Sequence, residues 1–169
     1  MAVAYISLGS NQGDRLFYLR SALDLLNQEW ALSVTAVSPL YETDPVGGPP
    51  QGLFLNACAA LCTSFSPASL MLILLAVEEK LGRIRRQQRW TARTLDLDLL
   101  IYDDVMMRTP LLELPHPRMT ERGFVLVPLA VVAPELIIPG TAKSVWMILE
   151  ERAPIEGVQL YRDRWFVII

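Results

Sequence analysis

Residues Leu95 to Tyr102 read Leu-Asp-Leu-Asp-Leu-Leu-Ile-Tyr, so apolar and acidic residues alternate before the segment becomes apolar throughout. Successive side chains of a strand point to opposite faces, and this segment is predicted to be a strand with its leucines in a core and its carboxylates on the other face. The roots of Asp96 and Asp98 would lie about 7 Å apart. Carboxylates at that spacing can converge on a pair of divalent ions, although an edge strand with one solvated face would show the same alternation.

A basic segment leads directly into this strand. Gly82 to Arg93 contains five arginines and no lysine, and guanidinium groups make bidentate contacts with phosphate that lysine cannot reproduce. Phosphoryl-type transfer needs metal ions and guanidinium groups together, because charge spreads over the transferring group as the leaving oxygen departs. Magnesium usually takes one or two protein carboxylates and completes its coordination with water and substrate phosphates. The pattern therefore favours a nucleotide site, with a solvated charged loop as the alternative.

Three strands and two helices are expected before this strand, separated by long polar loops over residues 44–52 and 83–92. The expected elements are strands over Val3 to Leu8, Ser33 to Tyr41 and Phe54 to Cys62, a helix marked by Leu16, Leu19, Leu23 and Leu26, and a helix from Pro67 to about Leu81 that ends at Gly82. The order βαββαβ is typical of an α+β ferredoxin-like core with an antiparallel sheet and flanking helices. The remaining expectations are short helices near Glu121 to Ala130 and Ser144 to Glu151, and a closing hairpin over Val158 to Val167.

The composition fits one globular domain over residues 1–169, because 52% of the 169 residues are hydrophobic and there is no long polar tract. The formal net charge is only -3, which predicts binding neither to nucleic acid nor to a membrane surface. The most apolar run, Ala68 to Val77, is shorter than a membrane span, and the N-terminus lacks the basic region of a signal peptide. We therefore expect a cytoplasmic protein. Because no residues remain for a second domain, we also expect the protein to act alone, as a monomer.

The two cysteines, the single histidine and one tryptophan are further candidates for chemistry. Cys58 and Cys62 are expected to be reduced, buried thiols on one face of a strand. The chain has no Gly-x-Ser-x-Gly, His-Glu-x-x-His or P-loop motif, which argues against the common serine hydrolases, zincins and P-loop ATPases. His116 is the only histidine, and although a lone histidine is more often structural, its arginine neighbours favour contact with a nucleotide. Trp90 stands among charges and could close over a flat ligand.

Taken in order, several motifs resemble the 6-hydroxymethyl-7,8-dihydropterin pyrophosphokinase family. They extend from the first strand to about Pro134 and comprise Gly9-Ser10-Asn11, Tyr41 to Gly47, Phe54-Leu55-Asn56, Glu78, Gly82-Arg83, Arg89-Trp90, Arg93 to Asp98, and Pro115 to Met119 leading to Arg122-Gly123-Phe124. The resemblance implies an α+β fold with a ferredoxin-like core, a pterin pocket and an ATP site with two magnesium ions. It also implies transfer of pyrophosphate from ATP to the pterin hydroxymethyl group, giving AMP and the pterin diphosphate for folate synthesis.

The resemblance further implies roles for individual residues. Asp96 and Asp98 would bind both metal ions, while Arg83 and Arg93 would stabilise charge on the moving group. The nucleotide-contacting set would be Glu78, Arg85, Arg89, Leu99, His116 and Arg122. The pterin would be bordered by Thr43, Pro45 and Val46, stacked between Phe54 and Phe124, hydrogen-bonded by Asn56 and covered by Trp90. The two long loops would be lids that exclude water, with Trp90 as the latch of the second.

Two positions depart from the family pattern. Thr91-Ala92 replaces a Gly-Pro pair, which changes the backbone freedom of the second lid. Leu75 replaces a glutamine, so one hydrogen bond to the nucleotide is expected to be missing.

Two other functions stay open from the residues alone. One is a glycosyltransferase that holds a metal with its Asp-x-Asp pair, although such a domain normally needs a longer α/β chain. The other is a regulatory or RNA-binding ferredoxin-like module. Paired aspartates would repel the phosphates of RNA unless a metal ion were present.

Overall fold

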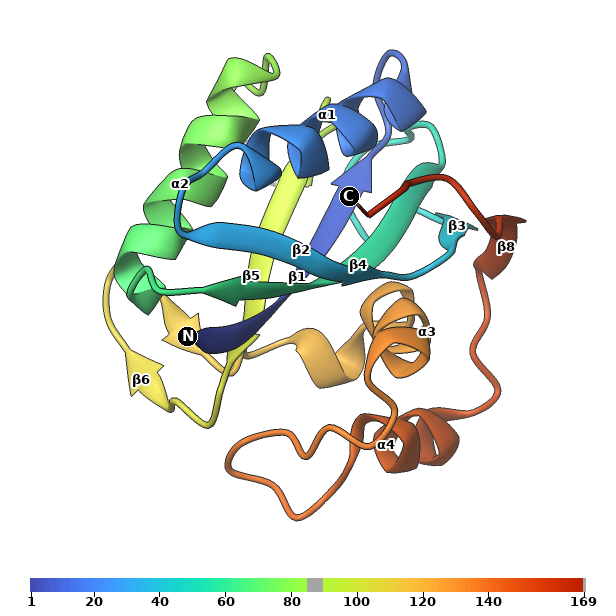
Figure 1. The fold of residues 1–169 in the computed structure, drawn as a ribbon. Coiled ribbons are helices and arrows are strands. Elements are labelled where there is room, and N and C mark those ends of the chain that lie inside the picture. The colour runs from blue at the N-terminus through green and yellow to red at the C-terminus, as the bar shows by residue number, and fades with distance from the viewer. Residues whose placement is uncertain (85–89, 169) are drawn as a thin grey trace.

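A six-stranded antiparallel sheet forms the middle layer of the protein. The computed structural model describes residues 1–84 and 90–168. The helices α1 (Arg15–Asn27) and α2 (Pro67–Lys80) cover one face of the sheet, and α3 (Gly123–Val132) and α4 (Val145–Arg152) lie on the other side (Figure 1). Among the described residues, no helix is both long enough and apolar enough to cross a membrane.

The strand order confirms the predicted ferredoxin-like core. The strand β1 (Ala2–Ser10) lies between β4 (Phe54–Thr63) and β5 (Asp96–Tyr102) and pairs with both. The strands β2 (Leu32–Val37) and β3 (Leu40–Thr43) pair with the other edge of β4. The helices α1 and α2 connect these strands across one face, and the order matches the predicted βαββαβ when β2 and β3 are counted as one interrupted strand.

Alternation along the strands divides the buried residues between two cores. On β4, Leu55 and Ala57 face α1 and α2, whereas Cys58 faces α3. Burial raises the pKa of the Cys58 thiol, whose Sγ lies 3.6 Å from the carbonyl oxygen of Val125. Cys62 is only half-buried, so the expectation of two buried thiols was wrong for Cys62, which lies near the end of the strand beside the N-terminus.

The predicted strand over Ser33 to Tyr41 is two strands, β2 and β3, separated by Ser38 and Pro39. Proline has no N–H to donate to the ladder, so the pairing is interrupted there. Ser38 keeps the break attached to β4, because its N–H donates to the Cys58 carbonyl at 2.9 Å and its hydroxyl accepts from the Cys58 N–H at 3.0 Å. The break lets β3 pair on its outer edge with β8 (Val158–Arg162).

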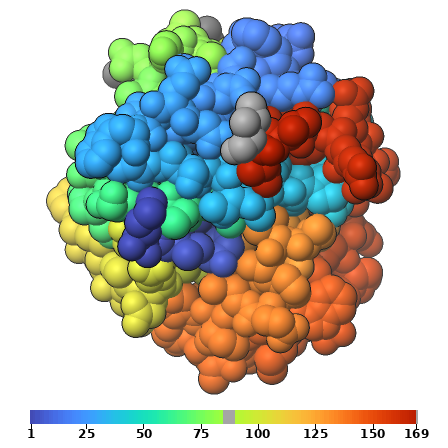
Figure 2. All heavy atoms as spheres, in the orientation of Figure 1, coloured from blue at the N-terminus to red at the C-terminus, as the bar shows by residue number. Residues whose placement is uncertain are grey.

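The hairpin predicted over Val158 to Val167 was wrong. Only β8 is a strand, and residues 163–168 form an extended segment, called here the C-terminal strap. After β8 the chain crosses to the α1 side of the sheet (Figure 1), and Figure 2 shows the red C-terminal segment lying against the blue surface. Trp165 is 4% exposed and packs into the core beneath α1 and α2. Its indole N–H donates to the Ser38 carbonyl at 2.8 Å, and its own carbonyl accepts from Arg20 Nε at 2.7 Å.

The remaining elements lie between β5 and β8. The helices predicted near residues 121–130 and 144–151 are confirmed as α3 and α4. The strands β6 (Met107–Arg108) and β7 (Glu113–Leu114) form a small separate sheet, followed by the 3-10 helix η1 (Met119–Glu121).

Replacing Trp165 with alanine is expected to lower the free energy of unfolding by about 3–5 kcal/mol, the range found when a large aromatic side chain is removed from a core. The substitution also removes the donor to the buried Ser38 carbonyl. Urea denaturation followed by circular dichroism would measure the loss. Trp30, which is 86% exposed, is the matched control, and Trp30→Ala should change stability by less than about 1 kcal/mol. Equal losses in the two variants would show that the strap is not part of the core.

Candidate active site

The floor of the site is a row of residues across three neighbouring strands. Gly9 on β1 lies opposite Asn56 on β4 and opposite Asp96 on β5, and two residues earlier Ser7 lies opposite Asp98. Residues two apart on a strand share a face, so Asn56 and both carboxylates project to the same side of the sheet.

The two faces of β5 divide as predicted. Leu97 and Leu99 are each 1% exposed and belong to the core beneath α1 and α2, whereas Asp96 and Asp98 line a cavity on the opposite face. The resemblance placed Leu99 among the nucleotide contacts. Its side chain points into the core, so the alternation of the strand leaves only its backbone for such a contact.

A cavity of about 580 Å³ lies above this floor. It brings together most of the expected site residues, namely Thr43, Val46, Phe54, Asn56, Arg83, Trp90, Arg93, Asp96, Asp98, His116, Arg122 and Phe124. Among the residues that the structure describes, Pro45 is an expected site residue that does not line this cavity. Arg85 and Arg89 lie outside the described residues. Residues to which the sequence analysis assigned no role also line it: Asp44, Gln51, Arg118 and Glu121.

A second cavity, of about 350 Å³, meets the first at the carboxylates. Arg83, Asp96 and Asp98 line both cavities. The rest of the smaller lining is Met71, Leu75, Glu78, Leu97, Pro110 and Leu111, of which only Glu78 and Leu75 were expected at the nucleotide site. The site is therefore two compartments that share a pair of acidic side chains and one arginine.

The end of α2 brings Glu78 and Arg83 to the start of β5. The helix ends at Lys80, and Gly82 follows with a φ of 83°, a left-handed conformation that glycine adopts readily. The chain turns back there, so that the Arg83 N–H donates to the Glu78 carbonyl at 3.0 Å. The Glu78 side chain is buried, accepts from the Leu97 N–H at 2.7 Å and pairs with the Arg83 guanidinium. Glu78 thus fixes both the arginine and the first residues of the strand.

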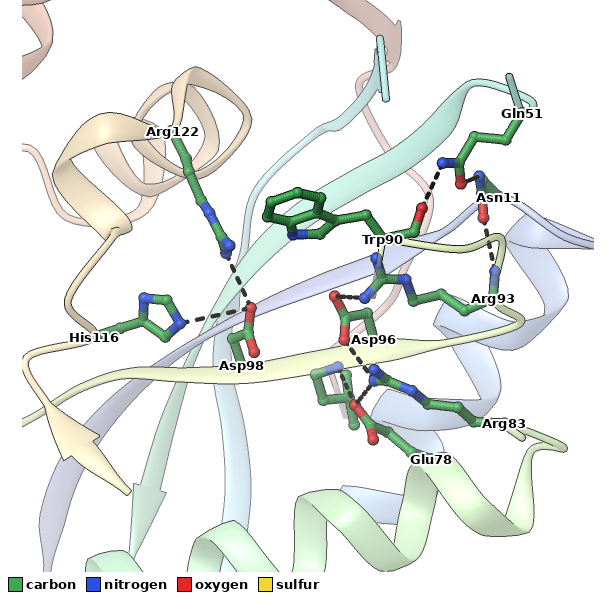
Figure 3. Close-up of polar contacts among 11 residues, drawn as sticks. Asn11, Gln51, Glu78, Arg83, Trp90, Arg93, Asp96, Asp98, His116 and Arg122 are labelled. Atoms are coloured by element: carbon green, nitrogen blue, oxygen red, sulfur yellow. Dashed lines mark hydrogen bonds and ion pairs between the residues drawn. The ribbon is translucent and has the colours of Figure 1, made fainter. Parts of the chain in front are cut away.

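Asp96 lies between two arginines (Figure 3). Its Oδ1 pairs with Nη1 of Arg83, and its Oδ2 lies 3.0 Å from Nη1 of Arg93. Burial alone would lower the pKa of Arg83, but Asp96 and Glu78 together raise it. The guanidinium therefore stays charged beside the carboxylate, and charges of both signs lie where the two compartments meet.

Asp98 faces Arg122 and His116 (Figure 3). Its Oδ2 lies 3.5 Å from Arg122 Nη1 and 4.0 Å from His116 Nε2. Burial, and after it the charge of Asp96, raises the pKa of Asp98 to about 6. A divalent cation would oppose both effects, since it brings positive charge to two neighbouring carboxylates and replaces the water that burial removes.

His116 is neutral at pH 7. Burial, followed by the charges of Arg122 and Arg118, lowers the pKa of its imidazole to about 4. The Arg118 N–H donates to His116 Nδ1 at 3.2 Å, which assigns the ring proton to Nε2, the nitrogen that faces Asp98. His116 therefore presents a hydrogen-bond donor to the site and carries no charge there.

Two phenylalanines line the end of the larger cavity that lies nearer β4. The Arg93 guanidinium carbon lies 5.6 Å from the centre of the Phe54 ring, and that of Arg122 lies 5.5 Å from the centre of the Phe124 ring. Among the described residues, the rings of Phe54 and Phe124 make no contact with each other. Both rings border the cavity, so a planar ligand has aromatic faces available to it.

Asn11 joins the two long loops that border the cavity (Figure 3). Its Nδ2 donates to Gln51 Oε1 at 2.9 Å, while its Oδ1 accepts from the Arg93 N–H at 2.9 Å. Gln51 Nε2 in turn donates to the Trp90 carbonyl at 2.7 Å. A β-carbon on Gly48 would lie 2.2 Å from that same carbonyl oxygen, so only glycine lets the loops approach this closely.

Asn11→Ala is expected to uncouple these loops. Amide hydrogen exchange in residues 46–52 should become about tenfold faster, since the variant loses hydrogen bonds that hold the loop. The free energy of unfolding should fall by no more than about 1 kcal/mol, because the loops lie outside the cores. Gln28→Ala, at an exposed position after α1, is the control. Unchanged exchange in the Asn11 variant would contradict a role in holding the loop.

Comparison with known proteins points to one family. The family model described as "7,8-dihydro-6-hydroxymethylpterin-pyrophosphokinase (HPPK)" matches residues 5–134. The chain is 48% identical over 162 residues to the 2-amino-4-hydroxy-6-hydroxymethyldihydropteridine pyrophosphokinase of Bacillus subtilis, an alignment that covers 96% of this chain and 92% of that protein. It is 42% identical over 155 residues to the protein of the same name from Pseudomonas aeruginosa, covering 92% of this chain and 94% of the other.

Solved structures share the fold. A crystal structure of Plasmodium falciparum HPPK-DHPS superposes with a TM-score of 0.75 and covers 93% of this chain at 15% identity. The present chain spans 48% of that longer polypeptide. At this identity the likeness concerns the fold alone.

Proposed function

The chain belongs to the 7,8-dihydro-6-hydroxymethylpterin-pyrophosphokinase (HPPK) family, and from that membership we propose how its residues divide the reaction among them. The protein is a pterin pyrophosphokinase: it transfers pyrophosphate from ATP to the hydroxymethyl group of 6-hydroxymethyl-7,8-dihydropterin, giving AMP and the pterin diphosphate in folate biosynthesis. Residues 1–169 act as one catalytic domain and as a monomer in the cytoplasm. The single domain is supported by the sheet, because both cores pack against the same one.

In this proposal the larger compartment holds the pterin and the smaller holds the nucleoside. Phe54 and Phe124 offer aromatic faces in the larger one, and Asn56 offers a polar group for the ring edge. The smaller compartment has an apolar lining of the kind that suits a base: Met71, Leu75, Pro110 and Leu111. The observation that carries the proposal is that the two compartments share one set of charged residues, so a triphosphate from one side meets the hydroxymethyl group from the other.

Asp96 and Asp98 fit two magnesium ions. Among the described residues no group of three or more His, Cys, Asp and Glu side chains could hold a metal, so the remaining ligands would be water and phosphate oxygens, as magnesium prefers. The raised pKa of Asp98 marks a carboxylate pair in need of positive charge. When bound, the ions supply charge neutralisation and orientation of the phosphates.

Arg83 and Arg93 stabilise the charge that develops on the transferred group. Each contacts Asp96 through Nη1, and a guanidinium has five N–H donors in a planar fork. Each arginine can therefore keep a carboxylate contact and still donate to phosphate oxygens. Glu78 acts one step further away, by holding Arg83 in place.

His116 and Arg122 hold the phosphates from the other side of the carboxylates. His116 contributes the Nε2 proton as a hydrogen-bond donor, and Arg122 contributes charge. A neutral imidazole with its proton already facing the site is a donor and not a proton acceptor at that nitrogen. We assign neither residue the role of a general base.

The two loops close over the substrates and exclude water that could take the activated pyrophosphoryl group. The indole of Trp90 packs against Gly47, where a β-carbon would lie 3.1 Å from the ring. The contacts among Asn11, Gln51 and Trp90 support the assignment of Trp90 as the latch.

The reaction itself is tested by incubating the purified protein with ATP, magnesium and 6-hydroxymethyl-7,8-dihydropterin. Formation of AMP that depends on the pterin is the expected result. Formation of ADP, or nucleotide cleavage that does not depend on the pterin, would contradict the function.

The assignment of the compartments has a separate test. Phe124→Ala is expected to raise the KM for the pterin about tenfold and to change the KM for ATP by less than about threefold, because it removes one stacking face. Leu75→Ala is expected to raise the KM for ATP by roughly threefold, because it removes apolar contact, and to leave the KM for the pterin unchanged. The opposite pattern would show that the pterin binds in the smaller compartment and the nucleoside in the larger.

A further inference from the structure

Gly9 occupies the middle of the site floor. It pairs with Asn56 on one side and with Asp96 on the other. Neighbouring strands are about 4.8 Å apart, so the polar edge of the floor at Asn56 and the carboxylate at Asp96 are separated by roughly 10 Å with Gly9 between them. A flat substrate that reaches from Asn56 to the carboxylates must cross β1 at this residue.

The backbone does not explain why this residue is a glycine. Gly9 lies inside a strand that is paired on both sides, and its φ lies outside the left-handed region, unlike those of Gly13 and Gly82. Alanine could adopt the same backbone conformation. What the glycine provides is therefore space above the sheet.

That space is occupied by the Asn56 side chain. A β-carbon on Gly9 would lie 2.7 Å from Asn56 Oδ1, which is closer than real contacts allow, and 3.7 Å from Asn56 Cγ and from Phe54 Cδ1. The carboxamide has little freedom to move away, because its Nδ2 donates to Thr43 Oγ1 at 2.6 Å. Asn56 and Thr43 are 5% and 2% exposed, so a displaced amide would lose this buried hydrogen bond.

We propose that Gly9 is a positioning residue of the pterin site: its missing side chain lets Asn56 place Oδ1 over β1 as the acceptor that reads the ring edge. Asn56 Nδ2 is committed to Thr43, and the structure gives Oδ1 no donor among the described residues. The oxygen is thus available to an N–H group of the substrate. This inference rests on the proposed function, since it assumes that the pterin lies against Asn56.

Gly9→Ala is expected to raise the KM for the pterin about tenfold, the effect of one misplaced hydrogen bond to the substrate. The dissociation constant for ATP, measured by calorimetry with magnesium, should change by less than about twofold. A substitution that disturbed the site in general would weaken the binding of both ATP and the pterin. Parallel losses for ATP and the pterin would therefore overturn the inference.

A double-mutant cycle with Asn56→Ala identifies the route of the effect. If Gly9 acts through Asn56, Gly9→Ala should change the KM for the pterin by less than about twofold once Asn56 is already alanine. An equal change in both backgrounds would overturn the inference. The double variant also removes the clash, so recovery of folded protein only in the double variant would support the inference even if Gly9→Ala alone did not fold.

The same cycle separates this inference from the proposed function. If Asn56→Ala weakens pterin binding while Gly9→Ala does not, the role of Gly9 is refuted and the pterin site stands. If Asn56→Ala leaves the KM for the pterin unchanged, the placement of the pterin is refuted, and the role of Gly9 with it. Pterin-dependent AMP formation by the wild-type protein tests the reaction independently of both.

Discussion

Replacing Asp98 with asparagine is expected to lower the rate of pterin-dependent AMP formation by about 10³-fold or more, and Asp96→Asn should have an effect of similar size. Asparagine keeps the shape of the side chain but removes the charge that would hold divalent cations beside the phosphates. The measurement is the rate at saturating ATP and pterin over a range of magnesium concentrations. A loss of less than tenfold at every magnesium concentration would contradict the assignment of the carboxylates as metal ligands.

The same substitution separates catalysis from folding. The pKa of Asp98 is raised from 3.8 to about 6, so between these pH values the folded protein keeps a proton that the unfolded chain has lost. The contribution of this group to stability therefore falls as the pH rises from about 4 to about 6, and it stays low above pH 6. Asp98→Asn removes this fall, and the variant should be more stable than the wild type at pH 7 by on the order of 1–2 kcal/mol, after allowing for the water that reaches the open pocket.

Urea denaturation at pH 4 and pH 7 in the presence of a chelator tests this expectation. The two proteins should differ little at pH 4, and the variant should be the more stable at pH 7. If Asp98→Asn is less stable than the wild type by the same amount at both pH values, Asp98 stabilises the fold through its contacts, and its buried charge does not destabilise it.

The central part of the fold could be predicted from the sequence because its signals are local. The alternation around Asp96 and Asp98 follows from strand geometry alone, and the leucines between them lie in the core as expected. The stop at Gly82 is likewise set by one residue, whose left-handed backbone conformation ends α2.

The errors lie where distant parts of the chain decide the structure. Ser33 to Tyr41 looks continuous, but Pro39 interrupts the pairing, and β3 then pairs with β8, more than a hundred residues further along the chain. The segment around Trp165 reads as a strand of a hairpin, yet its indole fills the core beneath α1 and bonds to Ser38. Periodicity alone carries no information about such partners.

At the candidate site, too, local signals were predictive and distant contacts were not. The motifs predicted the charged residues that meet at the carboxylates, because the basic segment is covalently joined to β5. They did not foresee that Asn11 and Gln51 tie the loops together, since an amide that bridges two loops has no periodic signature. The resemblance implied a separate nucleotide site, but Pro110 and Leu111 were not predicted in its lining, because they reach the smaller compartment from beyond β5.

Arg83→Lys is expected to reduce kcat by about 10²–10³-fold while changing the KM for ATP much less. Lysine keeps a positive charge near Asp96 and Glu78, but it lacks the planar fork that can hold a carboxylate and donate to phosphate at once. The charge that spreads over the moving pyrophosphoryl group would then lose a donor that is fixed in place before the reaction. Single-turnover formation of AMP measures the chemical step without product release.

The control is Arg118→Lys, because Arg118 is exposed at the edge of the same cavity. This substitution should change kcat by less than about threefold. The free energy of unfolding is measured for both variants, since Arg83 also contacts buried Glu78. A loss of kcat in Arg83→Lys with stability kept within about 1 kcal/mol would assign the arginine to the transition state. If kcat is unchanged and only the KM for ATP rises, Arg83 binds the ground state, and stabilisation of the transferred group must then come from Arg93 and the metal ions.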